Sequence, residues 1–497
     1  MARLTASLLL SGITALSAHA AVLQGTVTER RTGYVMSGAT LTLEPVPALG
    51  RPVRTVRSSE NGQFVFDSLP AGSYLLKATR RGFMPVQYGQ RGWDAAGVPV
   101  DIPGDITVTL TVPMQRWGAI VGTVRDPNEI GIADQDVAAY TNAQPPVFVA
   151  RGKSDDRGVF RIPGLEPGTY LVRSTGNNDD DHSYLPTFSR QTLRVDEARP
   201  VVVYADEDTP DADVRPIEGR LFTLTGYAAL PLGNFTVTVT LASDLGRITV
   251  NSPAFRFPAL APGHYEIYAE AIENPPGTRV LGGYTDVLVG RDIPNFTLPI
   301  NEVRATRFIV DGAGPDITAT AQMRRKDYAG TGPVRTVRLN AVTSVPVFPG
   351  RWEVRIIAPR GYYVSGFGGP RNIVARPDGW NEIQFSSFVY VDVTLSSGPA
   401  AVHGVVRDAS KPAAGAPVFI EGWDPITRNR LVDLQEIRTD TAGNYRFDNL
   451  APGDYRILST FDYASPTPQA FGALGGREIR LEKASDPALD LDLSGTP

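Results

Sequence analysis

Hydrophobic and polar positions alternate along most of this chain. Runs of Val, Thr, Ile and aromatic residues, as at residues 106–112, 235–241 and 389–395, place an apolar or aromatic side chain at every second position. Gly, Pro, Asn and Asp separate these runs. A period of two with β-branched side chains predicts β-strands, and no sustained helical period with caps follows the N-terminal segment. The sequence therefore predicts an all-β protein.

A short phrase recurs five times and organises the chain. It consists of aromatic or β-branched residues at alternate positions, a Pro-Gly or Pro-x-Gly step, and a closing aromatic residue. The closing residues are Tyr74, Tyr170, Tyr265, Trp352 and Tyr455, which lie 96, 95, 87 and 103 residues apart. Solenoid and propeller repeats run to about 20–50 residues, so this spacing predicts an array of whole domains.

Each part of the phrase predicts a local structure. Gly62, Gly158 and Gly443 end tight turns that need a positive φ. The alternate residues that follow, such as Phe64 and Phe66, are expected to face a core. The Pro-Gly step then reverses the chain. The closing tyrosines resemble the corner tyrosines of sandwich folds, whose hydroxyl binds the backbone, and we expect a structural role for them.

A second recurring element opens the units: a glycine followed two residues later by Val or Leu. Gly25, Gly122 and Gly219 lie 97 residues apart, and Gly404 opens the last unit. The fourth unit has lost this glycine near residues 304–307. The predicted organisation is a signal peptide at 1–20 and five seven-stranded Greek-key sandwiches at 21–113, 114–214, 215–300, 301–396 and 397–497. The acidic residues 206–213 are expected to form a solvated linker that closes the second sandwich.

The N-terminal segment indicates export. Arg3 precedes an apolar stretch, and Ala18-His19-Ala20 provides a small-residue cleavage site. No later segment is long and apolar enough for a membrane-spanning helix. These features predict an exported protein and leave open whether it stays in a periplasm, on the cell surface or outside the cell.

Composition excludes several kinds of chemistry. The chain has no cysteine, which excludes disulfides and thiolate metal sites. Its formal net charge of −5 gives no reason to expect nucleic acid as a partner. Each predicted domain must therefore be held by its apolar core.

The repeated phrase, the opening glycines and the small-residue strands near 38–41 and 415–418 resemble the carboxypeptidase regulatory-like domain. That family is a prealbumin-like seven-stranded Greek-key sandwich. The first, second and fifth units match its pattern well, the third partly, and the fourth only in the Pro-Gly-aromatic step. Because such domains occur as non-catalytic appendages of zinc peptidases, outer-membrane transporters and secreted surface proteins, the resemblance implies a non-catalytic protein.

A search for catalytic motifs is negative. His182, His264 and His403 have no glutamate three positions later, so the zinc-peptidase spacing is missing. No Gly-x-Ser-x-Gly nucleophile motif occurs. We expect no catalytic residue and no cofactor. Asp179, Asp180 and Asp181 are a weak calcium candidate, for which a plain polar loop is the alternative.

Aromatic residues in loops after the return strands are the main candidates for ligand binding. Tyr88, Phe188, Tyr284, Phe367 and Phe471 share this position. The candidate site residues are Tyr88, Trp93, Asp94, Tyr362, Tyr363, Phe367, Trp380 and Asn381. Flat rings beside polar groups suit sugars, because the ring covers C–H faces while the polar groups bind hydroxyls. The alternative is that the rings close the sandwich ends or pack between domains.

These observations predict an exported, non-catalytic, multidomain binding or scaffold protein. The main hypothesis is carbohydrate binding through the loop aromatics, with glycans as partners. The alternative is a structural or adhesive stalk that contacts proteins of the cell envelope. Glycan binding predicts exposed aromatics clustered on one face, whereas a stalk predicts aromatics buried where domains meet.

Overall fold

The computed structural model describes residues 21–46, 50–104, 106–178, 183–314, 316–369, 376–385 and 390–495. Within these ranges the strands form five two-sheet sandwiches, which confirms the all-β prediction. The predicted signal peptide and Asp179–Asp181 lie outside the described residues. Two compact units are present: unit 1 comprises Met1–Arg91 and Gly97–Met114, and unit 2 comprises Gly92–Ala96 and Gln115–Pro497.

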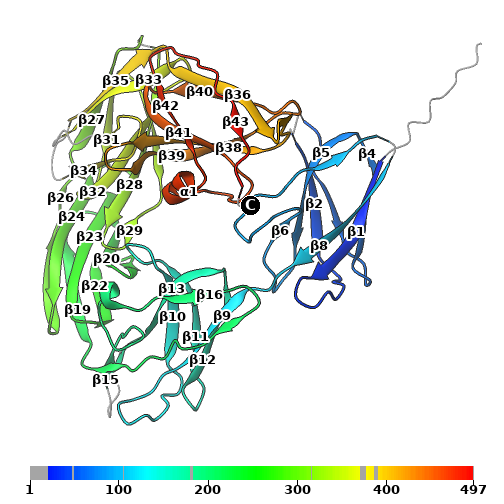
Figure 1. Ribbon diagram of the computed structural model, residues 1–497. Helices are drawn as coiled ribbons and strands as arrows, with labels where there is room; N and C mark the ends of the chain where they lie inside the picture. The colour runs from blue at the N-terminus through cyan, green and yellow to red at the C-terminus, as the bar shows by residue number, and fades with distance from the viewer. Residues whose placement is uncertain are drawn as a thin grey trace, which may run out of the picture. The chain divides into compact units, whose positions relative to one another are not determined.

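The first sandwich accounts for the strands of unit 1 and is drawn in blue in Figure 1. One sheet contains β4 (Gln63–Leu69), β1 (Ala21–Glu29) and β8 (Thr107–Met114). The other contains β3 (Arg54–Arg57), β2 (Thr40–Val46), β5 (Gly72–Thr79), β6 (Val86–Gln87) and β7 (Val100–Ile102). Phe64 and Phe66 are buried between the sheets, as predicted, with ring centroids 6.2 Å apart.

The second sandwich is the first of the four sandwiches in unit 2, which also includes the short segment Gly92–Ala96. Its sheets contain β12 (Val159–Leu165), β9 (Gly118–Thr123) and β17 (Asp208–Thr209), and β11 (Phe148–Lys153), β10 (Asp136–Thr141), β13 (Gly168–Ser174) and β16 (Val201–Val203). A small extra sheet is formed by β14 (Asn177–Asn178), β15 (Ser183–Leu185) and β18 (Ile217–Glu218), and a 3-10 turn spans Val195–Glu197.

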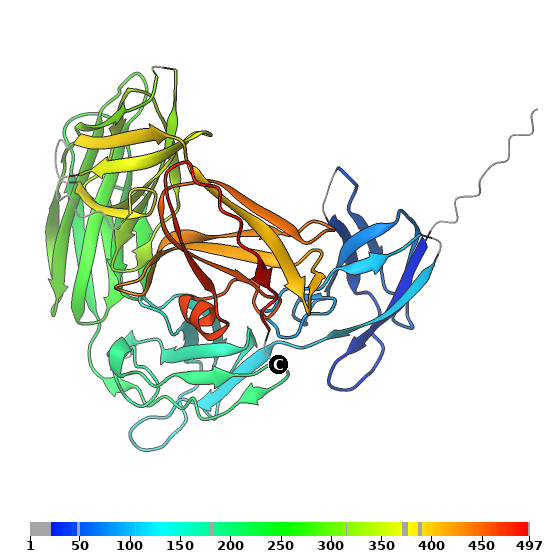
Figure 2. The same ribbon diagram turned by 45° about the horizontal axis from the view of Figure 1, so that its top comes forward.

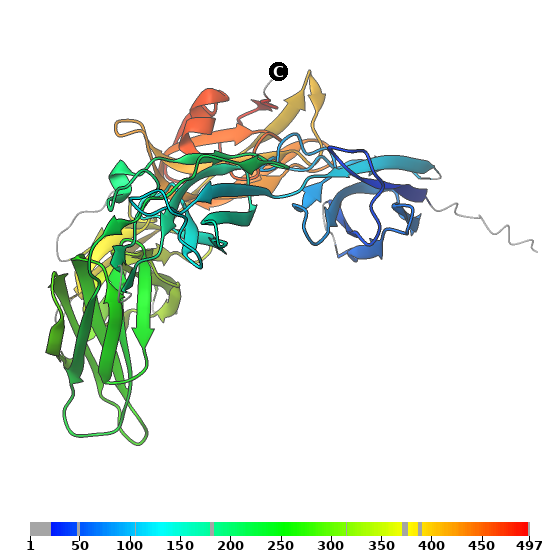
Figure 3. The same ribbon diagram turned by 90° about the horizontal axis from the view of Figure 1, so that it is seen from below.

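The third sandwich contains the longest strands, drawn in green in Figure 3. Its smaller sheet contains β22 (Ala254–Leu260), β19 (Phe222–Ala229) and β25 (Ile293–Pro299). Its larger sheet contains β21 (Gly246–Val250), β20 (Phe235–Ser243), β23 (Gly263–Glu273), β24 (Val280–Val289) and β26 (Asn301–Glu302).

The fourth sandwich follows without a long linker. One sheet contains β31 (Val342–Pro346), β27 (Ala305–Asp311), β35 (Tyr390–Ser397) and β33 (Tyr362–Gly368). The other contains β29 (Gly330–Thr331), β28 (Ala319–Asp327), β30 (Arg335–Leu339), β32 (Gly350–Ile357) and β34 (Asn381–Phe385).

The fifth sandwich ends the chain. Its sheets contain β37 (Lys411–Pro412), β36 (Ala400–Asp408), β40 (Asn444–Leu450) and β43 (Leu491–Asp492), and β39 (Asn429–Arg438), β38 (Pro417–Asp424), β41 (Gly453–Ser459) and β42 (Arg477–Leu481). A short helix that the sequence analysis missed, α1 (Pro468–Ala473), lies next to β41 (Figure 2, red). The hydroxyl of Thr467 caps it by accepting a hydrogen bond from the Ala470 amide.

The five sandwiches share one topology in the described residues. The first strand of each pairs antiparallel with the strand that carries the repeated phrase and parallel with a late strand. The parallel pairs are β1 with β8, β9 with β17, β19 with β25, β27 with β35, and β36 with β43. The Pro-Gly step takes the chain from one sheet to the other, as between β4 and β5. The phrase is therefore the corner of each sandwich.

The closing aromatic of every phrase makes the same hydrogen bond. Its hydroxyl or indole N–H donates to the carbonyl four residues earlier. The bonds run from Tyr74 to Pro70 (2.8 Å), Tyr170 to Glu166 (2.8 Å), Tyr265 to Ala261 (2.9 Å), Trp352 to Phe348 (2.9 Å) and Tyr455 to Ala451 (2.7 Å). This confirms the structural role expected for these residues and extends it to a tryptophan.

The opening glycine of the third sandwich was misassigned from spacing. Gly219 precedes β19, whereas Gly226 lies inside it and pairs with Phe296 of the parallel strand. A Cβ on Gly226 would lie 2.0 Å from the Phe296 carbonyl oxygen, as one on Gly25 would lie 2.0 Å from that of Leu110. The regular 97-residue spacing to Gly219 is thus a coincidence.

The acidic residues 206–213 are not a solvated linker. Asp208 and Thr209 form β17, which pairs with β9 inside the second sandwich. Asp208 forms an ion pair with Arg161 at 2.8 Å, and the Asp213 carboxylate accepts a hydrogen bond from the Thr123 amide at 2.7 Å. The acidic side chains cover the outer side of a strand whose backbone completes the sheet.

Candidate functional site

The third and fourth sandwiches meet around buried charges. Asp327, at the end of β28, is 5% exposed. Both of its carboxylate oxygens accept hydrogen bonds from Arg247 of β21, each at 2.7 Å. The Tyr268 hydroxyl of β23 donates to the same carboxylate at 3.0 Å, and the Ala329 amide donates at 2.9 Å. This carboxylate of the fourth sandwich is thus satisfied largely by side chains of the third.

Glu266 makes the reciprocal arrangement from the third sandwich. It lies on β23 and is 1% exposed. Its carboxylate accepts hydrogen bonds from Arg351 of β32 at 2.7 Å, from the Tyr284 hydroxyl at 3.0 Å and from the Tyr328 amide at 3.0 Å. Each sandwich therefore contributes one buried carboxylate whose cationic partner lies on its neighbour.

Arg325 of the fourth sandwich forms a third ion pair with the third sandwich, to Glu270. It donates to Glu270 at 3.2 Å, and its guanidinium carbon lies 4.0 Å from the centroid of the Tyr268 ring and 5.2 Å from that of Trp352. Stacking an arginine between aromatic rings compensates part of the loss of water around the charge. Only 7% of Arg325 is exposed.

The same burial perturbs the tyrosines of this junction. Burial, with the nearby Asp327 carboxylate, raises the pKa of Tyr268 to about 12. Burial and the Glu266 charge also raise the pKa of Tyr284. Both phenols therefore remain neutral hydrogen-bond donors at physiological pH.

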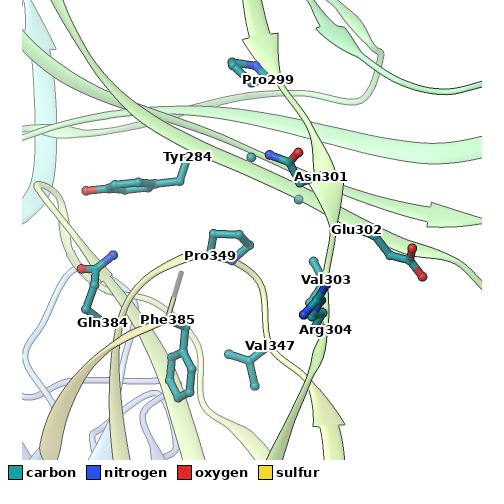
Figure 4. Close-up of a pocket in the computed structure, with 12 residues that line it drawn as sticks. Tyr284, Pro299, Asn301, Glu302, Val303, Arg304, Val347, Pro349, Gln384 and Phe385 are labelled. Carbon is teal, nitrogen blue, oxygen red and sulfur yellow. The ribbon is translucent and has the colours of Figure 1, made fainter. Parts of the chain in front are cut away.

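A cavity of about 220 Å³ lies beside this network, between β24, the connection after β25 and the fourth sandwich (Figure 4). Tyr284, Asn301 and Gln384 supply polar groups to its walls, and Pro349 and Phe385 supply apolar surface. Its walls carry no cluster of acids or nucleophiles suited to catalysis. The cavity is a feature of the domain junction.

A second groove lies between the fourth and fifth sandwiches and has a volume of about 420 Å³. Two of its lining residues, Tyr362 and Tyr363 of β33, are predicted site residues and are partly exposed. Asp433, Gln435 and Asn449 of the fifth sandwich line it too. Aromatic rings and side chains that bind hydroxyls thus occur together here.

Trp380 lies at the same junction, held between arginines. Its ring centroid is 4.0 Å from the guanidinium carbon of Arg324 and 4.9 Å from that of Arg355. Its indole N–H donates to Asp433 at 3.2 Å, and Arg355 also pairs with Asp433. The ring is partly buried and packs against two arginines, which differs from the expectation of a freely exposed binding ring.

Two further candidates are structural. Phe367 is 8% exposed and belongs to the core of the fourth sandwich. Asn381 is 4% exposed, and its amide donates to the carbonyls of Arg376 and Gly379. Neither side chain is accessible to a sugar, because core packing and a local turn occupy them.

The remaining candidates are distributed over both units. Tyr88 packs against the core of the first sandwich, and Asp94 is half-buried. Trp93 is 41% exposed. Two of the other loop aromatics, Phe188 and Phe471, are fully buried. The common loop position therefore contains packing residues as well as exposed rings.

Sequence analysis missed Glu266 and Asp327. A weak signal exists, because β23 carries Glu266, Tyr268 and Glu270 on the face opposite its core residues, and β28 carries basic residues before Asp327. Charge complementarity between consecutive units could have suggested a junction.

Among the described residues, no group of three or more His, Cys, Asp or Glu side chains could hold a metal ion. No helix in the described part of the chain is long and apolar enough to cross a membrane.

The fold and its junctions define an all-β tandem array of sandwiches. Residues 22–113 match the family model of the carboxypeptidase regulatory-like domain, which confirms the resemblance for the first sandwich. No curated protein matches the chain.

Solved structures of pilins show similarity to parts of the chain. The minor pilin GBS52 of Streptococcus agalactiae is 13% identical over 40% of this chain and 97% of its own, with a TM-score of 0.27. The shaft pilin SpaA of Lactobacillus rhamnosus GG is 13% identical over 40% and 98%, with a TM-score of 0.23. The major pilin SpaD of Corynebacterium diphtheriae is 10% identical over 76% and 97%, with a TM-score of 0.16.

Proposed function

We propose that this chain is an exported, non-catalytic scaffold, in which ion-paired junctions fix the spacing of consecutive sandwiches in unit 2 so that the array can make protein–protein contacts outside the cytoplasm. The observation that carries the proposal is the burial of Asp327 against Arg247 and Tyr268 of the preceding sandwich. A chain of freely moving domains would have hydrated polar surfaces at this point.

The energetics of buried ion pairs support a fixed junction. Both charges of each pair have lost most of their water in the junction. A movement that breaks a pair while one charge stays buried leaves that charge unpaired, at a cost of about 3–5 kcal/mol. Two such carboxylates, Asp327 and Glu266, are contributed by opposite sides of one junction. Their bidentate and multiple hydrogen bonds also specify a single orientation.

Spin-label distances test this proposal, and the absence of cysteine makes labelling specific. Thr297→Cys in β25 and Thr336→Cys in β30, both exposed, place one label on each sandwich. We expect a distance distribution as narrow as that of a pair within the third sandwich, Thr236→Cys with Thr297→Cys. A distribution that is much broader than this control and unchanged by Asp327→Asn would contradict a fixed scaffold.

Glycan binding is the second candidate, favoured by the groove between the fourth and fifth sandwiches. Tyr362 and Tyr363 line it opposite Asp433 and Asn449, which fits the recognition of a sugar by stacking and hydroxyl contacts. A glycan array with the full chain tests this candidate. Tyr363→Ala should abolish binding, while Tyr227→Ala, at a tyrosine that is 50% exposed, should not. If the wild-type protein binds no glycan on the array, the glycan hypothesis is contradicted and the scaffold proposal remains.

A further inference from the structure

A large cleft lies between the second and third sandwiches and reaches the junction of the third and fourth, because Arg247 and Tyr328 also line it. Its volume is about 590 Å³. The second sandwich contributes Tyr140, Arg173 and Leu193, and the third contributes the hairpin from Ser243 to Ile248 and the corner from Ala259 to Tyr265. The cleft thus joins an apolar wall to two arginines, Arg173 and Arg247, of which Arg247 is paired with Asp327.

Arg173 of β13 is partly buried and has no ion pair in the described residues; the Tyr140 side chain is its hydrogen-bond partner. Within those residues its Nε is buried without a hydrogen-bond partner. By contrast, Arg456 pairs with Glu421, and Arg247 pairs with Asp327. Burial lowers the pKa of Arg173, while Tyr140 and Asp244 act in the opposite direction. The guanidinium is therefore desolvated and only partly compensated.

The rest of the cleft offers apolar surface to the non-ionic part of a ligand. Leu193 is 44% exposed and Ile248 is 46% exposed, although both line the cleft. The Tyr265 hydroxyl is committed to the Ala261 carbonyl, so this ring offers its apolar face. One anionic group, Asp244, also lines the cleft.

We propose that this cleft binds an organic carboxylate, whose carboxylate pairs with Arg173 while an aromatic or aliphatic body covers Tyr140, Leu193 and Ile248. A planar guanidinium without an ion pair is the group best matched to a carboxylate. The ligand could be the C-terminus of a partner protein or a free carboxylic acid, and both have the same chemistry. This inference goes beyond the proposed scaffold function, because it assigns a ligand to this cleft and the scaffold proposal assigns none.

The proposal predicts an unusual effect on stability. A desolvated cation without an ion pair destabilises the unliganded protein, so replacing it with an apolar side chain of similar length should not lower the melting temperature. Arg173→Met keeps an apolar stem near the Phe188 ring, whose centroid lies 5.3 Å from the guanidinium carbon. A residue kept for structure alone would lose stability on the same substitution.

Calorimetric titration of the full chain tests the site with 3-phenylpropionate, N-acetyl-Leu-Phe and glucuronate, each beside its neutral amide. We expect at least one carboxylate to bind at least about tenfold more tightly than its amide, because a charge-assisted hydrogen bond is lost. Preference for the peptide indicates a protein partner, and preference for a small acid indicates a free ligand. Arg173→Met should abolish this difference, and Asp244→Asn should strengthen binding by removing repulsion.

The matched control is Arg161→Met, at a half-exposed arginine of the same sandwich that pairs with Asp208. It should leave binding unchanged. Equal affinity for acids and amides, or no saturable binding of any probe, would overturn the proposal. So would a fall in melting temperature for both Arg173→Met and Asp244→Asn, since that result would identify Asp244 as the partner of Arg173 in solution.

Discussion

The aromatic side chain that closes each sandwich corner acts as a hydrogen-bond donor as well as a core residue. Four tyrosines and Trp352 bind the carbonyl four residues earlier, within 2.7–2.9 Å. The tyrosine cases could be predicted from the Pro-Gly-Tyr pattern. The hydrogen bond of Trp352 could not, because an indole N–H replaces the phenol on which that prediction rests.

Removing one corner hydroxyl should cost a measurable amount of stability. Tyr170→Phe leaves the Glu166 carbonyl without this donor, and we expect a loss of about 1–2 kcal/mol in the free energy of unfolding of the second sandwich. Native-state hydrogen exchange of β12 and β13 measures it. The control, Tyr204→Phe, changes a tyrosine that is 58% exposed and should have no effect. Equal effects of the two substitutions would show that the corner bond is not stabilising.

The residue before the corner leucine that recurs in the first, second, third and fifth sandwiches adopts a positive φ. In the second sandwich it is Gly164, with φ of 79°, but in the third it is Ala259, with φ of 57°. An alanine is strained in this region by roughly 1 kcal/mol. Ala259→Gly should therefore stabilise the third sandwich, whereas Ala254→Gly, at an extended exposed position of β22, should destabilise it. Hydrogen exchange in β22 and β23 distinguishes the two, and a loss of stability in Ala259→Gly would refute the strain.

The strands themselves were largely predictable, because their alternation is strong and the phrase marks each corner. Two predictions were wrong, those for the acidic segment and for the opening glycine of the third sandwich. The acidic strand β17 has no apolar alternation, because it is two residues long and is held by backbone pairing with β9 and by the ion pair of Asp208 with Arg161. Gly219 matched the expected spacing, but the close approach of Phe296 requires a glycine at Gly226. Periodicity in sequence does not record which backbone lies opposite a residue.

Substitution of the two kinds of glycine tests the corrected register. Gly226→Ala places a methyl group against the Phe296 carbonyl, and backbone cannot yield as a flexible side chain can. We expect a loss of about 1–3 kcal/mol in the third sandwich. Gly290→Ala, where no atom lies within 4 Å of the added carbon, should be nearly neutral. Tolerance of Gly226→Ala in hydrogen exchange of β19 would contradict the assigned pairing.

The junctions of unit 2 were missed by sequence analysis, because the residues that pair across them are distant in the chain. Arg247 and Asp327 are 80 residues apart, and Glu266 and Arg351 are 85 residues apart. Each residue alone is typical of a solvated strand face. The packing of Trp380 against two arginines has the same origin, so a candidate for an exposed ring proved to be partly buried. Together these contacts favour the scaffold over the glycan hypothesis.

The junction should lose stability in alkali. The pKa of Tyr268 is about 12 in the folded protein and about 10 when unfolded. Its contribution is complete below pH of about 10 and is lost as the pH rises towards about 12, because only the unfolded state then releases the proton. Tyr268→Phe should reduce the decline in melting temperature over this range. An identical decline in Tyr268→Phe and wild type would refute the burial of this phenol.

Region-resolved hydrogen exchange of Asp327→Asn tests the coupling of the sandwiches most directly. The substitution weakens one ion pair across the junction and leaves the cores unchanged. The scaffold account predicts faster exchange both in β20 and β23 of the third sandwich and in β28 and β32 of the fourth, with no change in β1 and β2 of the first. Faster exchange confined to the fourth sandwich, or no change at all, would contradict it.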